Sequence, residues 1–250
     1  MRKFGLIGYP LGHSFSKKYF TEKFLREHIS DCSYDNYPLE DINQLKKLVT
    51  KEVDLCGLNV TIPYKSEIIR FLDSIDPEAS EIGAVNVLKI KRLHGTTKLL
   101  GYNSDVTGIR DSLFPFIKGS VRNAIVLGTG GSSKAVCYVL RKSGINITQI
   151  SRVKKTGVSI YEDINVELLS NTDLIINTTP LGMFPNIKGK PEFNYNLLSG
   201  KHILFDLVYN PEITSFLKNG MTKGCTVISG IKMLHSQAEK SWEIWNDDSM

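Results

Sequence analysis

Apolar runs of strand length alternate with amphipathic segments through the first part of the chain. The predicted strands cover residues 3–10, 32–39, 54–63, 83–90 and 96–103, and the predicted helices cover residues 16–29, 42–53 and 65–75. In the helix at 16–29 the aromatic and aliphatic residues recur near the 3.6-residue helical spacing. This alternation of strand and helix predicts a mostly parallel sheet.

A second alternating region begins near residue 109. Residues 123–152 combine a strand, a glycine turn, a helix and another strand, and further strands are predicted at 173–180, 202–210 and 224–230. We therefore expect an α/β fold with an N-terminal domain at 1–108, built on a mostly parallel sheet, and a Rossmann-like domain at 109–231. Residues 232–250 should form a C-terminal helix that returns to the first domain, because chain ends commonly lie near each other.

Composition favours an ordinary globular protein that acts on small molecules. The 250 residues are 41% hydrophobic and 23% charged, and the net charge of +5 is too small and too dispersed to indicate a nucleic-acid partner. No apolar run reaches the roughly 18 residues of a membrane span. The four cysteines form no CxxC pair, which argues against zinc and disulfides and fits a cytoplasmic location. The five histidines show no metal-binding pattern.

The glycine turn between two predicted elements is a candidate nucleotide loop. Its pattern is Gly128-x-Gly130-Gly131-x-x-x-Ala135, and glycines in such a turn let the backbone and the following helix N-terminus approach a phosphate. Ser133 stands where GxGxxG has its third glycine, so the loop alone could also be a plain tight turn. A P-loop would need Gly-Lys-Ser/Thr at its end, and Ser133-Lys134-Ala135 does not supply it.

The residues after the next strand indicate which dinucleotide is bound. An NAD-binding domain usually carries an acidic residue about 20 residues past the first glycine. This chain has Ser151, Arg152, Val153, Lys154 and Lys155 there. Arg and Lys attract a 2′-phosphate that a carboxylate would repel. We expect NADP(H) rather than NAD(H), although an exposed basic turn is an alternative explanation.

Polar residues gather at the ends of the strands predicted in the first domain. The stretch GLNVTIPYK at 57–65 supplies Asn59, Thr61 and Lys65, and later strand ends supply Asn86 and the run 103–105. Period-2 alternation places Asn59 and Thr61 on one face of their strand. Turn chemistry could explain each residue singly, but ligands of open α/β sheets bind at strand ends, so the clustering favours a ligand site.

The loop at 8–16 offers two hydroxyls, Ser14 and Ser16, among glycines. Such a loop can hold a small carboxylate through neutral hydrogen bonds. Alternatively, Ser16 caps the helix that begins near Lys17.

Together these motifs resemble the shikimate dehydrogenase family in its short, single-function bacterial form, over essentially the whole chain. The matching segments are 8–16, 59–65, 83–86, 101–108, 128–135, 177–183, 206–214 and 230–238. Departures from the family pattern include Ser104 in place of threonine and Lys17 in place of proline. The segment 151–153 also reads Ser-Arg-Val in place of Asn-Arg-Thr.

The resemblance implies an oxidoreductase that reversibly reduces 3-dehydroshikimate to shikimate with NADPH, in the chorismate and aromatic amino acid pathway. Lys65 and Asp105 would form the catalytic pair. A lysine in water is protonated at neutral pH, so Lys65 is suited to donate a proton to the forming alkoxide, but which of the two moves the proton stays open. The resemblance implies substrate contacts from Ser14, Ser16, Asn59, Thr61, Asn86, Asp105, Tyr209 and Gln237. It implies NADP contacts from Gly128, Thr129, Gly130, Gly131, Ser132, Ser151, Arg152, Lys155, Thr178, Leu207 and Gly230.

Three alternatives remain at this point. One is a close relative that acts on quinate or uses NAD and NADP equally, and another is a nucleotide-sensing protein without catalysis. The third is a methylene-tetrahydrofolate-type dehydrogenase, which the paired serines and the hydroxyl-binding asparagines disfavour. We expect a small-molecule substrate, no nucleic acid, no membrane, no metal, and a monomer or homodimer.

Overall fold

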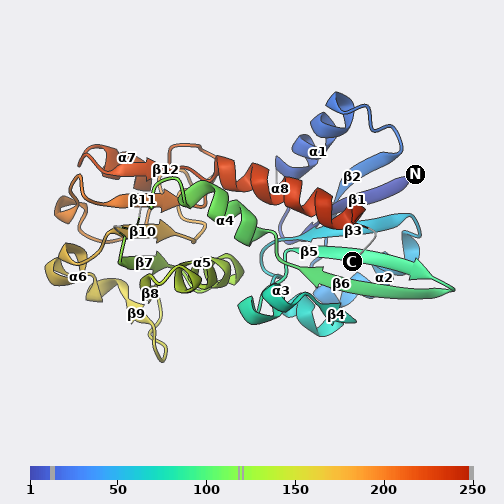
Figure 1. Cartoon of the computed structure of the whole chain (residues 1–250), viewed down its shortest axis with the longest axis horizontal. Coiled ribbons are helices and arrows are strands. Elements are labelled where there is room, and N and C mark those ends of the chain that lie inside the picture. The colour runs from blue at the N-terminus through green and yellow to red at the C-terminus, as the bar shows by residue number, and fades with distance from the viewer. Residues whose placement is uncertain (12–14, 118, 120, 248–250) are drawn as a thin grey trace. The chain divides into compact units, whose positions relative to one another are not determined.

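The computed structural model describes residues 1–11, 15–117, 119 and 121–247 (Figure 1). The chain divides into two compact units, Met1–Ser104 with Ala238–Met250, and Asp105–Gln237. The sequence predicts the domain boundaries at 108/109 and 231/232, whereas the two units divide at 104/105 and 237/238. The α/β class and the mostly parallel sheets are confirmed.

The first unit is built on a six-stranded sheet with the order β2-β1-β3-β5-β6-β4. Its strands are β1 (Arg2–Gly8), β2 (Cys32–Pro38), β3 (Leu55–Val60), β4 (Ser74–Ile75), β5 (Val87–Leu93) and β6 (Thr96–Tyr102). Its helices are α1 (Phe15–Arg26), α2 (Leu45–Lys51) and α3 (Pro77–Ile82), with 3-10 turns η1 (Ile42–Gln44) and η2 (Glu67–Phe71). The first three strands in the sheet order run parallel, and β5 is antiparallel to both β3 and β6.

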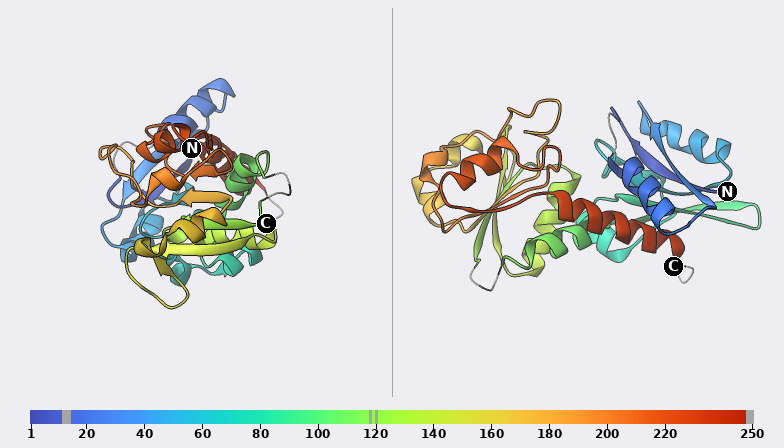
Figure 2. Two further views of the ribbon diagram at one scale, coloured as in Figure 1. Left: turned by 90° about the vertical axis from the view of Figure 1, so that its left-hand side faces the viewer. Right: turned by 90° about the horizontal axis from the view of Figure 1, so that it is seen from above.

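Two separate cores cover the two faces of this sheet. One contains α2 and η2 residues with Leu58 and Val60 of β3. The other contains aromatic residues of α1 and of the end of α8 (Ile231–Asn246), and Figure 2 shows α1 and α8 on one side of the sheet and α2 on the other. Because side chains alternate along a strand, Asn59 points away from Leu58 and Val60, toward the α1 and α8 side.

The predicted helix at 65–75 is wrong for most of its length. The structure has only the five-residue η2 there, followed by β4. Asp73 bonds to Leu99 through both its backbone N–H and its carboxylate, and Ser74 and Ile75 pair with β6. Pairing with the sheet therefore outweighs the amphipathic pattern in a short segment, where helix propensity is a weak determinant.

The second unit carries a six-stranded, fully parallel sheet with the order β12-β11-β10-β7-β8-β9. Its strands are β7 (Asn123–Leu127), β8 (Asn146–Ser151), β9 (Ser159–Ile160), β10 (Leu174–Asn177), β11 (Ile203–Asp206) and β12 (Thr226–Ile228). Its helices are α4 (Asp105–Leu113), α5 (Gly131–Lys142), α6 (Val166–Ser170), α7 (Ser215–Met221) and the start of α8, with 3-10 turns η3 (Tyr161–Asp163) and η4 (Tyr195–Leu197). The strand order reverses between β7 and β10, which is the switch point where open α/β sheets bind ligands.

The last turns of α8 are built into the first unit. The Trp245 indole donates to the Leu88 carbonyl at 3.1 Å, and a Cβ on Gly57 would lie 2.3 Å from its nitrogen. The buried Lys89 ammonium donates to the Ile244 carbonyl at 2.9 Å, so it satisfies a carbonyl at the C-terminus of α8. The C-terminal segment therefore completes the core of the first unit.

Candidate functional site

A chain of buried hydrogen bonds crosses the α1 and α8 face of the first unit. Ser16, in the first turn of α1, lies close enough to Tyr34 to affect the pKa of its hydroxyl. The Tyr34 hydroxyl donates to Asn59 Oδ1 at 2.8 Å, and burial raises the pKa of Tyr34, so this group stays a donor. Asn59 Nδ2 in turn donates to Ser241 Oγ at 2.9 Å and to the Asn86 carbonyl at 3.4 Å. Every polar atom of the Asn59 side chain thus has a partner.

The same network continues to Asn86. Ser241 Oγ lies 3.1 Å from Ser104 Oγ, and Ser104 Oγ accepts from Asn86 Nδ2 at 3.0 Å. The Ser104 backbone N–H donates to Asn86 Oδ1 at 2.7 Å. The side chains of Asn86, Ser104 and Ser241 are almost fully buried. The Asn86 amide is therefore held in one orientation, with Oδ1 toward the start of the next helix.

The loop that carries Lys65 is anchored by its backbone on both sides. The Thr61 N–H donates to the Ile7 carbonyl at 2.9 Å, and the Tyr64 N–H donates to the Thr61 carbonyl at 2.9 Å. The Val85 N–H donates to the Lys65 carbonyl at 2.7 Å, which ties Lys65 to the residue before Asn86. Lys65 is half-buried. The NVTIPYK segment thus holds its polar residues on a fixed backbone.

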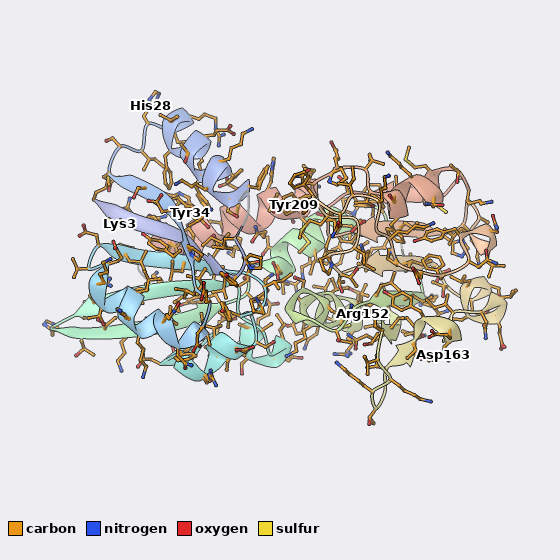
Figure 3. The ribbon with its side chains drawn as sticks, turned by 180° about the vertical axis from the view of Figure 1, so that it is seen from behind. Lys3, His28, Tyr34, Arg152, Asp163 and Tyr209 are labelled. Atoms are coloured by element: carbon orange, nitrogen blue, oxygen red, sulfur yellow. The ribbon has the colours of Figure 1, made fainter. Side chains whose placement is uncertain are left out.

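The remaining residues expected at the substrate lie in several places. Asp105 is buried, starts α4 and follows the network residue Ser104 directly. Gln237, in α8, donates to the Leu234 carbonyl at 3.2 Å. Tyr209, labelled in Figure 3, is half-buried, and burial raises the pKa of its hydroxyl. Ser14 lies outside the described residues.

In the second unit the glycine turn lies at the switch point after β7. Gly128 has φ +115°, and a Cβ there would lie 2.5 Å from Thr178 Oγ1, which itself donates to the Leu127 carbonyl at 2.6 Å. Gly128 is therefore required by the fold. Gly130 differs, because a Cβ there would meet nothing within 4 Å and its φ is −80°.

The start of α5 has the features of an anion site. Gly130 is its N-cap and supplies no side-chain hydrogen bond, and no acidic residue lies in the first turn of this twelve-residue helix. The Lys155 ammonium lies 3.4 Å from Thr129 Oγ1, and Arg152 is exposed at the end of β8 (Figure 3). Open space at Gly130, backbone N–H groups and nearby cations fit a phosphate-bearing cofactor.

Ser133 explains the missing third glycine of the loop. Its hydroxyl donates to the Gly128 carbonyl at 2.7 Å, and Gln149 Nε2 donates to both Ser133 Oγ and the same carbonyl. The serine is completely buried. It therefore ties the turn to α5 and β8 where a glycine would only allow close packing.

A buried carboxylate organises the turns after β10 and β11. Asp206 Oδ1 accepts from Asn177 Nδ2 at 2.9 Å and from the Val208 N–H at 3.0 Å, and Oδ2 accepts from Thr214 Oγ1 at 2.6 Å. Burial raises the pKa of Asp206 to about 6 against these hydrogen bonds. Asp206 thereby holds together the segments 177–183 and 206–214.

Leu207 and Gly230, both expected near the cofactor, lie against each other. A Cβ on Gly230 would lie 2.5 Å from the Leu207 carbonyl oxygen, and the Gly230 N–H donates to the Val208 carbonyl at 3.3 Å. Only glycine allows this approach of two backbone segments.

Residues 6–88 match the family model described as the shikimate dehydrogenase substrate binding domain. The chain is 39% identical over 259 residues to a shikimate dehydrogenase (NADP(+)) of Methanococcus aeolicus, an alignment that covers 96% of this chain and 90% of that protein. The chain belongs to the shikimate dehydrogenase family.

Solved structures of shikimate dehydrogenases agree in fold over nearly the full length. A shikimate dehydrogenase from Peptoclostridium difficile aligns with a TM-score of 0.82 at 38% identity, covering 100% of this chain and 94% of that one. A shikimate 5-dehydrogenase from Thermus thermophilus in complex with NADP(H) and shikimate aligns with a TM-score of 0.82 at 27% identity, covering 98% and 94%.

The sequence motifs assign no role to some buried polar residues. Tyr34 and Ser241 lie outside the matched segments, and Asp206 is the first residue of the matched segment 206–214 without a role there, yet all three belong to buried hydrogen-bond networks. Asp206 carries a signal, since it is a charged residue at the end of the apolar run of β11. Ser241 carries none, because it lies 182 residues from its partner Asn59.

Neither a membrane-spanning helix nor a metal-binding cluster occurs in the part of the chain that the structure describes. Within it, no helix combines the length and apolar character of a membrane span. The same residues contain no cluster of three or more His, Cys, Asp or Glu arranged to hold a metal ion.

Proposed function

We propose that this protein catalyses the reversible, NADPH-dependent reduction of 3-dehydroshikimate to shikimate. The observation that carries the proposal is the 39% identity to a shikimate dehydrogenase (NADP(+)) across 96% of the chain. The motif residues Lys65, Asn86 and Asp105 lie within that span. The shikimate complex of a structural relative at 27% identity supports the same substrate class.

The substrate would be held at two ends. Ser14, Ser16, Thr61 and Tyr209 supply neutral hydroxyls suited to its carboxylate, while Asn86, Asp105 and Gln237 are suited to its ring hydroxyls. A site that pairs several hydroxyls discriminates strongly, because an analogue lacking one leaves buried polar groups without partners.

Proton transfer is assigned to Lys65 and Asp105. In the reduction direction the Lys65 ammonium donates a proton, or a strong hydrogen bond, to the oxygen that becomes the new hydroxyl. Asp105 orients that oxygen and the ammonium by accepting hydrogen bonds. Its peptide link to Ser104 supports this role, since Ser104 is fixed by the buried network around Asn86.

NADPH, when bound, supplies the hydride. The start of α5, with Gly128, Thr129, Gly130, Gly131 and Ser132, would bind its pyrophosphate. The exposed side chains that follow β8, Ser151, Arg152 and Lys155, would bind the 2′-phosphate. Thr178, Leu207 and Gly230 would line the nicotinamide end, where the Gly230 backbone already packs against Leu207.

The same proposal covers where and in what form the enzyme works. NADPH-dependent reduction in aromatic amino acid biosynthesis is chemistry of the cytoplasm, and the four free cysteines fit a reducing compartment. We propose a monomer or a homodimer as the working state.

An absorbance assay at 340 nm tests the proposal. Purified protein is given shikimate or quinate as substrate, each with NADP or NAD. We expect NADPH formation with shikimate, and at least tenfold lower kcat/KM with quinate or with NAD. Absence of turnover in all four combinations would reject a dehydrogenase, and higher kcat/KM with quinate would assign the enzyme to that substrate instead.

A further inference from the structure

We propose that Tyr34 and Ser241 are positioning residues for substrate recognition, acting through Asn59 on the Asn86 amide. The proposal rests on the proposed function, because it concerns how the same site reads its substrate. The carrying observation is the continuous hydrogen-bond chain Tyr34–Asn59–Ser241–Ser104–Asn86 within the first unit.

Every polar atom of the Asn59 side chain already has a partner in the protein. Its Oδ1 accepts from Tyr34 at 2.8 Å, and its two amide hydrogens have acceptors in Ser241 Oγ and the Asn86 carbonyl. Asn59 is 6% exposed. A side chain in this condition orients its neighbours, whereas a residue that binds a hydroxyl needs an available donor or acceptor. Asn59 is therefore assigned a positioning role in place of the direct substrate contact expected from the motif.

The network also determines which end of the Asn86 amide is the donor. An asparagine amide can turn over and exchange its oxygen with its nitrogen. At Asn86 the Ser104 N–H occupies Oδ1 at 2.7 Å, and Ser104 Oγ accepts from Nδ2 at 3.0 Å. Ser104 Oγ is also 3.1 Å from Ser241 Oγ, which accepts from Asn59. Loss of the Ser241 hydroxyl removes the side-chain link between the two asparagines and leaves only the 3.4 Å hydrogen bond from Asn59 Nδ2 to the Asn86 carbonyl.

Tyr34 also connects the network to the helix that carries Ser16. Its ring stacks on Phe20 of α1 with centroids 4.5 Å apart, and Ser16 lies in the first turn of the same helix. Ser16 is assigned to the substrate carboxylate and Asn86 to the ring hydroxyls, so Tyr34 lies between the two proposed ends of the substrate. Tyr34 thus fixes the start of α1 relative to β3 from the interior of the unit.

The experiment compares Tyr34→Phe and Ser241→Ala with two matched controls. Tyr195→Phe makes the same change at a buried tyrosine of the second unit, whose hydroxyl donates to the Pro191 carbonyl at 2.7 Å. Ser112→Ala makes the other change at a buried serine whose Oγ has no hydrogen-bond partner among the described residues. For each protein we measure the melting temperature, the KM values for shikimate and NADP, and the Kd of shikimate by calorimetry.

We expect Tyr34→Phe and Ser241→Ala each to raise KM and Kd for shikimate by about fivefold, the effect of one hydrogen bond, with KM for NADP unchanged. In the double variant, KM and Kd for shikimate should rise by less than the product of the two single fold-changes, because both substitutions act through Asn59. The two controls should leave both KM values unchanged, whatever they do to the melting temperature.

Two results overturn parts of this account, and they can be told apart. If Tyr34→Phe and Ser241→Ala lower the melting temperature as Tyr195→Phe does but leave the Kd of shikimate within twofold of the parent, the network is structural only. If the parent protein neither binds nor oxidises shikimate, the proposed function itself fails, and the positioning role fails with it.

Discussion

The Thr214 hydroxyl donates a 2.6 Å hydrogen bond to one oxygen of the buried Asp206 carboxylate, while Asn177 and the Val208 N–H occupy the other oxygen. Burial raises the pKa of this carboxyl group, and the three hydrogen-bond donors offset only part of that rise. The pKa is therefore about 6. The carboxylate therefore costs stability at neutral pH while it fixes the turns after β10 and β11.

Asp206→Asn should change how stability depends on pH. An aspartate in the unfolded chain releases its proton near pH 3.8, whereas folded Asp206 keeps it to about pH 6. The contribution of Asp206 to folding therefore falls as pH rises from about 4 to about 6 and then stays level. Relative to the parent, the variant should gain about 3 kcal/mol between pH 4 and pH 7. Urea unfolding of both proteins at several pH values measures this, and a constant difference across that range would contradict it.

Lys65→Ala should lower kcat by about 10²- to 10⁴-fold, the usual contribution of a positioned proton donor, with a smaller change in KM for shikimate. Steady-state assays at 340 nm measure both values. Lys51→Ala, which removes an exposed lysine at the end of α2 in the same unit, is the control and should retain parental kinetics. A Lys65 variant with near-parental kcat would exclude this residue from the chemistry.

Arg152→Ala should raise KM for NADP by about tenfold, the loss of a charge-assisted hydrogen bond, and leave KM for NAD unchanged. The reason is that the guanidinium is assigned only to the 2′-phosphate, which NAD lacks. Arg141→Ala, at an exposed arginine in the last turn of α5, is the matched control. Equal losses with both cofactors would mean that Arg152 does not read the 2′-phosphate.

Gly130→Ala separates the needs of the fold from those of the cofactor. A Cβ at this position meets no protein atom within 4 Å and the backbone φ is negative, so the melting temperature should stay within about 2 °C of the parent. If a phosphate lies against Gly130, KM for NADP should rise by at least tenfold. Gly128→Ala should instead lower the melting temperature, because its Cβ would collide with Thr178. Unchanged NADP binding by Gly130→Ala would remove the phosphate from this position.

Local patterns predicted the parts of the site that depend on neighbours in sequence. The glycine turn after β7, the basic residues after β8 and the alternation that turns Asn59 away from Leu58 all follow from spacing within a few residues. The α/β class follows from the alternation of strand and helix over longer stretches.

Interactions between distant segments could not be predicted in this way. The segment 65–75 loses its predicted helix because β6 pairs with β4. Ser241 meets Asn59 only because α8 packs on the first sheet, and nothing near Ser241 in sequence marks that contact. Tyr34 belongs to a predicted strand, but its hydrogen bond to Asn59 depends on the register of three strands, and its ring contact with Phe20 depends on α1.

The division of the first unit into two separated stretches has a consequence for synthesis on the ribosome. Residues 105–237 form a continuous unit whose core needs no later segment of the chain. The first unit lacks Ile244 and Trp245 until the end of α8 has been synthesised. During most of elongation, Phe4, Phe20 and the backbone at Gly57, against which Trp245 packs, are therefore uncovered. Such exposed aromatic surface is what chaperones bind, and the half made first is therefore the half that matures last.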